Sequence, residues 1–485
     1  MASKQDKWLL RTLRGHTFDD FLNPPGHGVV QSRREISLGT KFSENINLGI
    51  PLVSANMDTV TGARMAIALA KQGGIGIIHR YLSIEEEAQK IREVKREENF
   101  IISEPYSTSP LKRISEATAL MKKRNVGCLM VVDEERKLVG ILTSRDMRFS
   151  LSDELVSRRM TPRGKLIVAG PKTTLEVAKK LLDKNRLEKI PLVDKDFKLV
   201  GLITSTDIEN LEKYPLANKD SNGQLIVGAA IGAKGDFLER SAELIKAGVD
   251  VIVIDIANSQ SVVGEDSVKA FRKRFPDMEL VCGNIVLPSY AQKLQSLGVN
   301  GIKVGLGPGR ACTTRFHTNI GVPQAQAVYE CVRSAKVPIT ADGGIRRDGH
   351  LTMALLLGAS SAMLGSLFAG TDESPGHVFS DQNGEKYKTF RGMASREAMY
   401  EKLISESADD PYETSTRISP EGMEMRVKYK GSVVPIIQTA MDHLASAISY
   451  LGARSLTEAK DIFMKNPQKY LIKLSQASKE ESFNR

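Results

Sequence analysis

A glycine-rich segment with one thiol carries the clearest chemical signal in this sequence. It runs from residue 303 to residue 315 and reads Lys-Val-Gly-Leu-Gly-Pro-Gly-Arg-Ala-Cys-Thr-Thr-Arg. Its glycines and proline, placed after a short apolar run, let the backbone approach a ligand closely or coordinate a cation through carbonyl oxygens. Cys312 follows this strand end, where a thiol can be both exposed and activated. We therefore predict that Cys312 is a nucleophile.

The other three cysteines, Cys128, Cys282 and Cys331, lack such a context and are predicted to be buried structural residues. Four cysteines make neither a disulfide framework nor a Cys-x-x-Cys zinc pair, which favours a reduced, cytoplasmic protein. The polar N-terminus has no apolar segment of a secretory signal, and the final Phe-Asn-Arg is not a peroxisomal Ser-Lys-Leu signal.

Short apolar segments provide the elements that must position these residues. They span residues 51–54, 74–79, 226–230, 251–255, 280–284, 301–304, 338–342 and 361–365. Continuous apolar strands that alternate with helical stretches are typical of a parallel sheet buried on both faces. Eight of them predict a TIM barrel. A doubly wound sheet is the alternative, but no Gly-x-Gly-x-x-Gly turn follows the first strand.

Polar residues recur where these predicted strands end. Asp255, Asn284, Asp342 and Ser366 all lie at such positions. In a TIM barrel the chemistry takes place on the loops at the carboxyl ends of the strands. The placement of these residues therefore supports the barrel and predicts one common site.

A duplicated segment interrupts the alternation of strands and helices. Residues 120–125 are echoed by residues 181–186, and residues 137–146 by residues 198–207, both at an offset of 61. Each copy predicts a helix, a short apolar strand, a charged turn and a second strand that ends in Thr-Ser-x-Asp. Units this small cannot bury a core alone, so the two copies should pack as a pseudo-dimer.

We accordingly divide the chain into three segments. Residues 1–97 begin the barrel. Residues 216–485 complete it and contain the cysteine loop (residues 303–315) and a segment that we call the flap (residues 405–417). Residues 98–215 hold the two copies, at about 98–150 and 160–213.

The duplication resembles a pair of CBS motifs, the nucleotide-sensing arrangement called a Bateman module. In that family the threonine and aspartate at the end of the second strand bind ribose and help to orient phosphate. The matching residues here are Thr143, Asp146, Thr204 and Asp207. The alternative is that each Thr-Ser-x-Asp caps the helix that follows it.

Composition narrows the classes of protein and of partner. The 485 residues are 41% hydrophobic and 26% charged, which is ordinary globular usage, and no run approaches about 18 apolar residues, so no membrane segment is expected. The net charge of +10 suits anionic ligands. Basic and acidic residues are interleaved, as at Lys95-Arg96-Glu97-Glu98, so we expect no nucleic-acid surface.

Several segments together resemble the family of inosine-monophosphate (IMP) dehydrogenase and guanosine-monophosphate (GMP) reductase. Besides the cysteine loop, the matching segments are residues 54–60, 74–79, 255–259, 283–284, 341–346, 365–366 and 391–393. The resemblance covers roughly residues 16–455, with the CBS pair inserted where the dehydrogenases carry it. It implies a TIM barrel with an inserted Bateman domain, and an oxidoreductase that acts at C2 of a purine 5'-monophosphate.

The resemblance also implies roles for particular residues. Cys312 would attack C2 to form a covalent thioimidate, while Thr314 and Glu421 relay a proton at the leaving or attacking group. Asp342 would hold the ribose hydroxyls. The other residues implied to bind the nucleotide are Ser54, Asn284, Arg310, Gly343, Gly344, Gly365, Ser366, Phe390, Arg391, Gly392, Met393, Ala394 and Glu421. Among these, Gly344, Gly365 and Ser366 would bind phosphate, and Gly392 and Met393 would meet the base edge.

The implied cofactor is NADP or NAD, with Asp255 accepting hydrogen bonds from the nicotinamide ribose. The residues on the same side are Ile256, Ala257, Gly305, Leu306 and Gly307. The carbonyl groups of Gly307, Gly309 and Cys312 match the potassium-binding loop of the dehydrogenase. The family expectation is a homotetramer that can pair into octamers through CBS modules, which bind purine nucleotides.

Two departures from the family pattern matter. The dehydrogenase activates water with an Arg-Tyr dyad on a flap, but here Tyr412 follows Pro411 and has no arginine beside it. This favours the reductase, which converts GMP and NADPH to IMP, ammonia and NADP. At Arg310 the family usually has a phosphate-binding serine; the arginine could contact phosphate in a bidentate manner or point away and leave that role to Ser366.

Two alternatives remain open. The CBS insert and the long flap favour the dehydrogenase, which converts IMP, NAD and water to XMP and NADH, and Arg417 could then fill the dyad position. A remote alternative from another class is a non-catalytic nucleotide sensor. The joint presence of Cys312, Thr314, Asp342 and Glu421 argues against that alternative.

Overall fold

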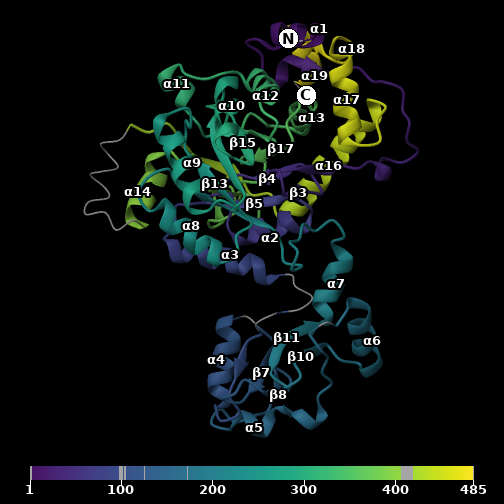
Figure 1. Ribbon diagram of the computed structural model, residues 1–485, viewed down its shortest axis with the longest axis vertical. Helices are drawn as coiled ribbons and strands as arrows, with labels where there is room; N and C mark the ends of the chain where they lie inside the picture. Colours follow the sequence, from purple (N-terminus) through teal and green to yellow (C-terminus); the bar gives the residue numbers. More distant parts are fainter. Residues whose placement is uncertain are drawn as a thin grey trace. The chain divides into compact units, whose positions relative to one another are not determined.

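A computed structural model describes residues 3–97, 102, 105–124, 126–171, 173–405 and 419–483, without the side chains of residues 207, 210–212 and 405. The chain divides into two compact units, which Figure 1 colours by sequence. We call Met1–Lys95, Leu216–Asp220 and Leu225–Arg485 the barrel unit. The insert unit comprises Arg96–Pro215 and Ser221–Gln224.

The barrel unit contains a closed barrel of eight parallel strands, which confirms the predicted TIM barrel. In order around the barrel, the strands are β12 (Val227–Ile231), β13 (Val251–Asp255), β14 (Leu280–Ile285), β15 (Gly301–Val304), β16 (Ile339–Asp342), β17 (Ser361–Leu364), β4 (Leu52–Ser54) and β5 (Ile75–Ile78). Nearly all of their residues are buried, because side chains fill the barrel on one face and pack under helices on the other. That double burial explains why the strands read as continuous apolar runs.

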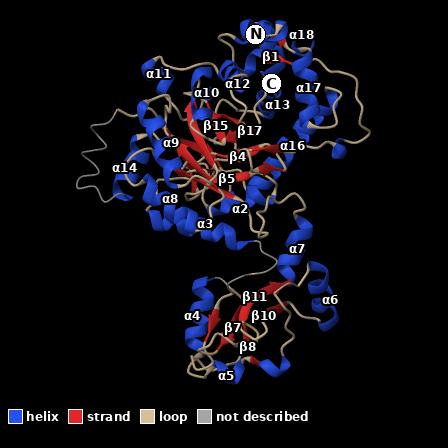
Figure 2. Cartoon of the chain, viewed as in Figure 1, coloured by secondary structure: helices blue, strands red, loops and turns tan. Residues whose placement is uncertain are grey.

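Helices surround this barrel, as Figure 2 shows with strands in red and helices in blue. They are α2 (Ala63–Lys71), α3 (Ile84–Glu97), α8 (Phe237–Lys246), α9 (Val262–Arg274), α10 (Pro288–Ser296), α12 (Gln324–Val332), α13 (Asp348–Leu356) and α16 (Val433–Tyr450). Each returns the chain between consecutive parallel strands or closes the circle after the last one. Among the described residues, no helix is long and apolar enough to cross a membrane.

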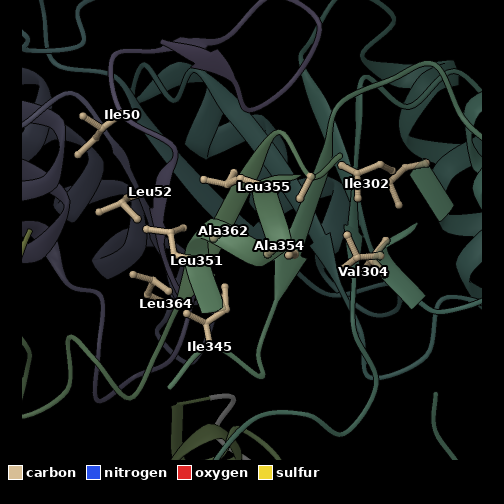
Figure 3. Packing of buried hydrophobic residues seen from close by; sticks show 14 of the residues in the cluster. Ile50, Leu52, Ile302, Val304, Ile345, Leu351, Ala354, Leu355, Ala362 and Leu364 are labelled. Atoms are coloured by element: carbon tan, nitrogen blue, oxygen red, sulfur yellow. The ribbon is translucent and has the colours of Figure 1, made fainter. Parts of the chain in front are cut away.

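Helix α13 is anchored firmly on the barrel. Leu351, Ala354 and Leu355 are at most 1% exposed and lie against the barrel wall beside Ala362 and Leu364 (Figure 3). Burial of each leucine contributes about 1.5–3 kcal/mol relative to exposure. The loop that joins β16 to α13 therefore leads into a fixed helix start.

The two ends of the chain are tied together beside the barrel. Strand β1 (Phe21–Leu22), which follows α1 (Lys4–Leu13) and the short helix η1 (Phe18–Asp20), pairs with β21 (Ile472–Lys473). The remaining barrel-unit elements are η2 (Arg33–Glu35), β2 (Thr40–Lys41), β3 (Asn47–Leu48), α11 (Thr314–Thr318), β18 (Phe379–Ser380), β19 (Lys386–Arg391), α14 (Arg396–Ser405), β20 (Glu424–Lys428), α17 (Leu456–Lys465), α18 (Pro467–Tyr470) and α19 (Gln476–Phe483).

The insert unit repeats one set of elements. Its elements are β6 (Ser107–Thr108), α4 (Ile114–Arg124), β7 (Cys128–Val132), β8 (Leu138–Thr143), α5 (Val156–Arg159), β9 (Thr161–Pro162), η3 (Arg163–Lys165), α6 (Leu175–Asn185), β10 (Lys189–Val193), β11 (Leu199–Thr204) and α7 (Ser205–Lys213). The first residues of α6, β10 and β11 each lie 61 positions after those of α4, β7 and β8. Both hairpins also shift register at matching places, between residues 131 and 132 and between residues 192 and 193.

The ends of the second strands differ between the two copies. In the first, Asp146 accepts hydrogen bonds from the backbone and the hydroxyl of Thr143, both at 2.7 Å, within a series of turns rather than at a helix start. Helix capping therefore does not explain Asp146. In the second copy α7 begins directly after Thr204, and the side chain of Asp207 lies outside the described residues. Nucleotide binding by these four residues stays a prediction.

Candidate active site

A cavity of about 340 Å³ lies at the carboxyl ends of the barrel strands. The predicted site residues that line it are Asp255, Ile256, Ala257, Asn284, Gly305, Gly307, Gly309, Arg310, Cys312, Asp342, Gly343, Gly344, Gly365, Ser366, Phe390, Gly392, Met393 and Ala394. These residues come from five of the eight strand ends, from β19 and from the residues that follow β19. Residues from the predicted catalytic, substrate-binding and cofactor-binding groups therefore line one and the same cavity.

Five of the residues predicted for catalysis, substrate binding and cofactor binding do not line this cavity. They are Ser54, Leu306, Thr314, Arg391 and Glu421. Ser54 is fully buried, and its hydroxyl accepts a hydrogen bond from Thr61 at 2.9 Å. Thr314 and Glu421 lie behind the residues that line the cavity, where Thr314 contacts both Cys312 and Glu421.

Cys312, Thr314 and Glu421 form a continuous hydrogen-bonded chain. The Cys312 thiol lies 3.3 Å from the Thr314 hydroxyl, which donates to a Glu421 carboxylate oxygen at 2.7 Å. Cys312 is half-buried and faces the cavity, whereas the other three cysteines are buried. A proton that leaves the thiol can therefore pass through one hydroxyl to a carboxylate.

Backbone pairing with the segment around Glu421 fixes this chain of three residues. The Thr313 amide donates to the Glu421 carbonyl at 2.8 Å, and the Met423 amide donates to the Ala311 carbonyl at 3.0 Å. Gly392 packs against the same place, since a Cβ there would lie 2.6 Å from the Ala311 carbonyl oxygen. A glycine at 392 is thus required for the close approach of β19 to the cysteine loop.

Lys303 connects the two aspartates assigned to ribose binding. Its ammonium lies 2.6 Å from Asp255 and 3.0 Å from Asp342, and the side chain is 2% exposed. Asn56 donates to the second oxygen of Asp255 at 2.9 Å, and Asn284 donates to Asp342 at 2.9 Å. Both carboxylates are therefore oriented before any ligand binds.

The charges in this cluster stabilise one another. Burial alone would raise the pKa of Asp255, but Lys303 and Asn56 hold it below its ordinary value. Burial alone would lower the pKa of Lys303, but the two carboxylates raise it. At neutral pH the cluster contains an ammonium between two carboxylates, with acceptor oxygens available for hydroxyl groups of a ligand.

Met393, which is predicted to meet the base edge, is held by two contacts. Tyr81 donates from its hydroxyl to the Met393 carbonyl at 2.8 Å, and the Asp58 amide lies 3.4 Å from the Met393 sulfur. The Arg391 guanidinium pairs with Asp58 at 2.7 Å and with Glu401 at 2.5 Å. Arg391 thus directs its charge away from the cavity, which it does not line.

The residues predicted to bind phosphate offer mainly backbone groups. Gly343 and Gly344 have φ angles of 81° and 79°, a left-handed conformation that favours glycine, in the loop after β16. Ser366 lies in the turn after β17, where Lys430 donates to its carbonyl at 3.0 Å. Arg310 lines the cavity with an exposed side chain, so it can reach a phosphate.

The predicted potassium loop offers carbonyl donors but no converging carboxylates. Gly309 accepts the Cys312 amide at 3.1 Å, which turns the loop back on itself. Carbonyl oxygens are the donors that suit potassium, so the residues fit this ion and its binding stays a prediction. Within the described ranges, no three His, Cys, Asp or Glu side chains converge to hold a metal ion.

Several site residues were missed from the sequence. The cavity is also lined by Asn56, Arg80, Tyr81 and Lys303. A lysine within an otherwise apolar strand was the available signal for Lys303, because buried lysines need charged partners. The flap residues Pro411, Tyr412 and Arg417 lie outside the described part of the chain, so their predicted roles remain untested.

Residues 15–484 match the family described as the IMP dehydrogenase / GMP reductase domain. The chain is 44% identical over 472 residues to inosine-5'-monophosphate dehydrogenase of Nitrosopumilus maritimus, covering 96% of this chain and 97% of the relative. It is 42% identical over 454 residues to the protein of the same name from Halalkalibacterium halodurans, covering 92% of each.

Solved structures give a second comparison. The chain is similar to GMP reductase from Trypanosoma brucei in complex with guanosine 5'-monophosphate, with a TM-score of 0.90, 38% identity and coverage of 96% of this chain and 97% of the other. For the complex of the same enzyme with guanosine 5'-triphosphate, the TM-score is 0.79 at 35% identity, covering 95% and 98%. The sequence relatives and the structural neighbours thus carry the names of two different activities.

Proposed function

Since the chain belongs to the IMP dehydrogenase / GMP reductase family of purine nucleotide oxidoreductases, we propose that it acts as a GMP reductase. In this reaction GMP, NADPH and two protons give IMP, ammonium and NADP. The observation that carries the proposal is the hydrogen-bonded chain from Cys312 through Thr314 to Glu421. This chain is complete without any flap residue, whereas activation of water in the dehydrogenase direction requires a dyad on the flap.

The proposed steps follow from these positions. The Cys312 sulfur bonds to C2 of GMP while its proton passes through Thr314 to Glu421. The relay then returns the proton to the 2-amino group, which leaves as ammonia and creates a thioimidate. After hydride has reached C2, the carbon–sulfur bond breaks, and the thiolate regains a proton that solvent supplies through the same relay.

The remaining residues bind and orient the two reactants. The nicotinamide cofactor, when bound, supplies the hydride. Asp255, oriented by Lys303 and Asn56, fits the role of acceptor for the hydroxyls of the cofactor ribose. Asp342, bonded to the same lysine, would accept from the nucleotide ribose. Strands β13 and β16 are not neighbours, but Lys303 contacts both aspartates, so the two riboses would lie close together, which favours the approach that hydride transfer needs.

The direction of the reaction is tested by following the absorbance of reduced nicotinamide with purified full-length protein. We expect absorbance to fall with GMP and NADPH, and little or no rise with IMP and NAD. Fast formation of XMP from IMP and NAD, lost on Arg417→Ala, would overturn the reductase proposal. It would instead assign Arg417 to the activation of water.

The dehydrogenase is the second candidate because both sequence relatives named above carry that name. The same assay separates the candidates, since one consumes reduced cofactor and the other produces it. If reduced cofactor is neither consumed nor produced, the result would support the third alternative, a nucleotide sensor without catalysis.

Replacing Glu421 with glutamine should slow deamination more than it weakens GMP binding. The amide keeps the shape of the side chain and can accept from Thr314, but it cannot take up a proton. We expect kcat to fall by roughly 10²–10⁴-fold with a small change in the Kd of GMP. Single-turnover kinetics and calorimetry measure the two quantities. As a control, Glu424→Gln changes a carboxylate on the neighbouring β20 that lies outside the relay.

Removal of the insert should erase nucleotide regulation and leave catalysis. The cavity is lined only by residues of the barrel unit. Lys95, the last barrel-unit residue before the insert, pairs with Asp220 at 3.0 Å, so a short Gly-Ser linker can rejoin the chain. We expect ATP or GTP to change the activity of the full chain but not that of a variant without residues 98–215. A shortened variant that still responds to these nucleotides would contradict the Bateman assignment.

A further inference from the structure

A histidine supports the loop that follows β16 from behind. His350 lies in the first turn of α13 and is 2% exposed. Its Nδ1 atom is 3.2 Å from both the Arg346 amide nitrogen and the Gly344 carbonyl oxygen. The imidazole therefore contacts two peptide groups of the loop that carries the proposed phosphate cradle.

An aspartate from the start of the chain fixes the other side of this ring. The Nε2 atom of His350 lies 2.7 Å from a carboxylate oxygen of Asp19, which is 331 positions earlier in the sequence. Arg347 donates to the same oxygen at 3.1 Å. When Nε2–H donates to the carboxylate, Nδ1 carries no proton and accepts the Arg346 amide. Asp19 thus selects the tautomer that holds the loop backbone.

The ring is neutral in this arrangement. Burial lowers the pKa of His350, and the neighbouring Asp19 offsets only part of that shift. The charged groups in this contact are therefore the Asp19 carboxylate and the Arg347 guanidinium. The ring itself acts as an uncharged bridge between the carboxylate and the loop.

Both ends of the chain hold Asp19 in place. Leu474 donates its amide to the Asp20 carbonyl at 2.9 Å, and Lys479 of α19 pairs with the Asp20 carboxylate. The ring of Phe483 lies 3.7 Å from the guanidinium carbon of Arg347. Figure 1 shows the N- and C-terminal segments side by side at this edge of the barrel unit. The terminal segments thus form a rigid support for one active-site loop.

We propose that Asp19 and His350 are a positioning pair that sets residues 343–347 for the 5'-phosphate of the nucleotide. The pair touches no substrate and acts through the backbone of Gly344 and Arg346. This inference rests on the proposed function in one respect, namely the assignment of Gly344 to the phosphate. It predicts that the N-terminal segment controls affinity for the phosphate group rather than for the base or ribose.

The test compares ligands that differ only in the phosphate. Calorimetry on the full chain would measure the Kd of GMP, with the Ki of guanosine and of inorganic phosphate from competition. In Asp19→Ala, which changes a partly exposed residue, the Kd of GMP should rise between about twofold and tenfold, as the loss of one hydrogen bond allows. The Ki of phosphate should rise with it, and the Ki of guanosine should stay unchanged.

His350→Phe removes both contacts and should raise the Kd of GMP by at least about tenfold. His443→Gln is the matched control. His443 is an exposed residue of α16, and it pairs at 2.6 Å with Asp348, which lies in the same turn of α13 as His350. Equal losses for GMP and guanosine, or no loss for either ligand in Asp19→Ala, would overturn the proposal. If the unchanged protein turns over IMP instead of GMP, IMP and inosine replace GMP and guanosine, so failure of the reductase proposal leaves this test valid.

Discussion

Replacing Cys312 with serine is expected to lower kcat by at least about 10³-fold, while the Kd of the nucleotide changes by less than about threefold. A serine hydroxyl fits the space of the thiol, but it is far less acidic and a weaker nucleophile. The Thr314–Glu421 relay can accept a proton from a thiol, whereas a hydroxyl would need a stronger base. Steady-state kinetics and calorimetry on the same preparation measure turnover and binding.

The other cysteines provide controls. Burial raises the pKa of Cys282 and of Cys331 to about 12 and also raises that of Cys128, so these thiols stay protonated. Cys331→Ala, which leaves the cavity untouched, should keep kcat within about twofold of the unchanged protein. Turnover by the Cys312→Ser variant within tenfold of the unchanged protein would remove Cys312 from the mechanism.

The barrel was predictable because its strands are buried on both faces. A segment such as Val251–Asp255 needs apolar side chains toward the barrel interior and toward the helices, which leaves a continuous hydrophobic run. The chain order of eight such runs then determines the neighbours, since successive parallel strands pair through right-handed crossovers. The duplication was predictable for a different reason: copies at a constant offset of 61 residues keep the same hairpin register.

The site was only partly predictable, because strand ends identify residues but not the directions of their side chains. Asp255, Asn284 and Asp342 lie at the carboxyl ends of their strands and meet at one end of the barrel, as expected. Arg391 also lies at a strand end, yet its guanidinium pairs with the carboxylates of Asp58 and Glu401, which do not line the cavity. That orientation depends on Asp58, a residue 333 positions away, and a single sequence does not reveal such a contact.

The support from the chain ends was equally hidden in the sequence. Asp19 and His350 have ordinary neighbours and no motif spacing, because the contact between them is made by tertiary packing. The pairing of β1 with β21 that brings Asp19 to this place involves two residues in each strand. Elements this short leave no periodic pattern.

Replacing Lys303 with methionine should affect stability and both binding steps. Methionine has a similar length, but it leaves the carboxylates of Asp255 and Asp342 without their shared cation. Removing one partner from a buried ion pair typically costs about 3–5 kcal/mol. We expect a loss of this size in urea unfolding, together with increased KM values for the nucleotide and the cofactor. Lys336→Met, an exposed lysine in the loop before β16, is the matched control and should change none of these quantities.

The stability loss should depend on pH. In the unchanged protein, Lys303 helps to keep the pKa of Asp255 below its ordinary value of 3.8, so this stabilisation is present above that pH and is lost as pH falls through the lowered pKa. In Lys303→Met the same burial, without the cation, raises the pKa of the carboxylate. Protonation then relieves the unpaired charge, so the difference in stability between the two proteins should be largest at neutral pH and shrink toward acid pH.

The KM values show whether Lys303 orients both aspartates or only one of them. Lys303 contacts Asp255 at 2.6 Å and Asp342 at 3.0 Å, so one substitution should weaken the binding of both reactants. If the lysine oriented only Asp342, the KM for the nucleotide would rise alone and the cofactor would bind as before. A rise in both values would assign the coupling to Lys303. Asn56→Ala should raise mainly the value for the cofactor, since Asn56 donates to Asp255 at 2.9 Å and only accepts a longer bond from Lys303, at 3.3 Å. Lys303 of β15 would then hold both ribose-binding aspartates and so set the distance between the two riboses, across which the hydride must move.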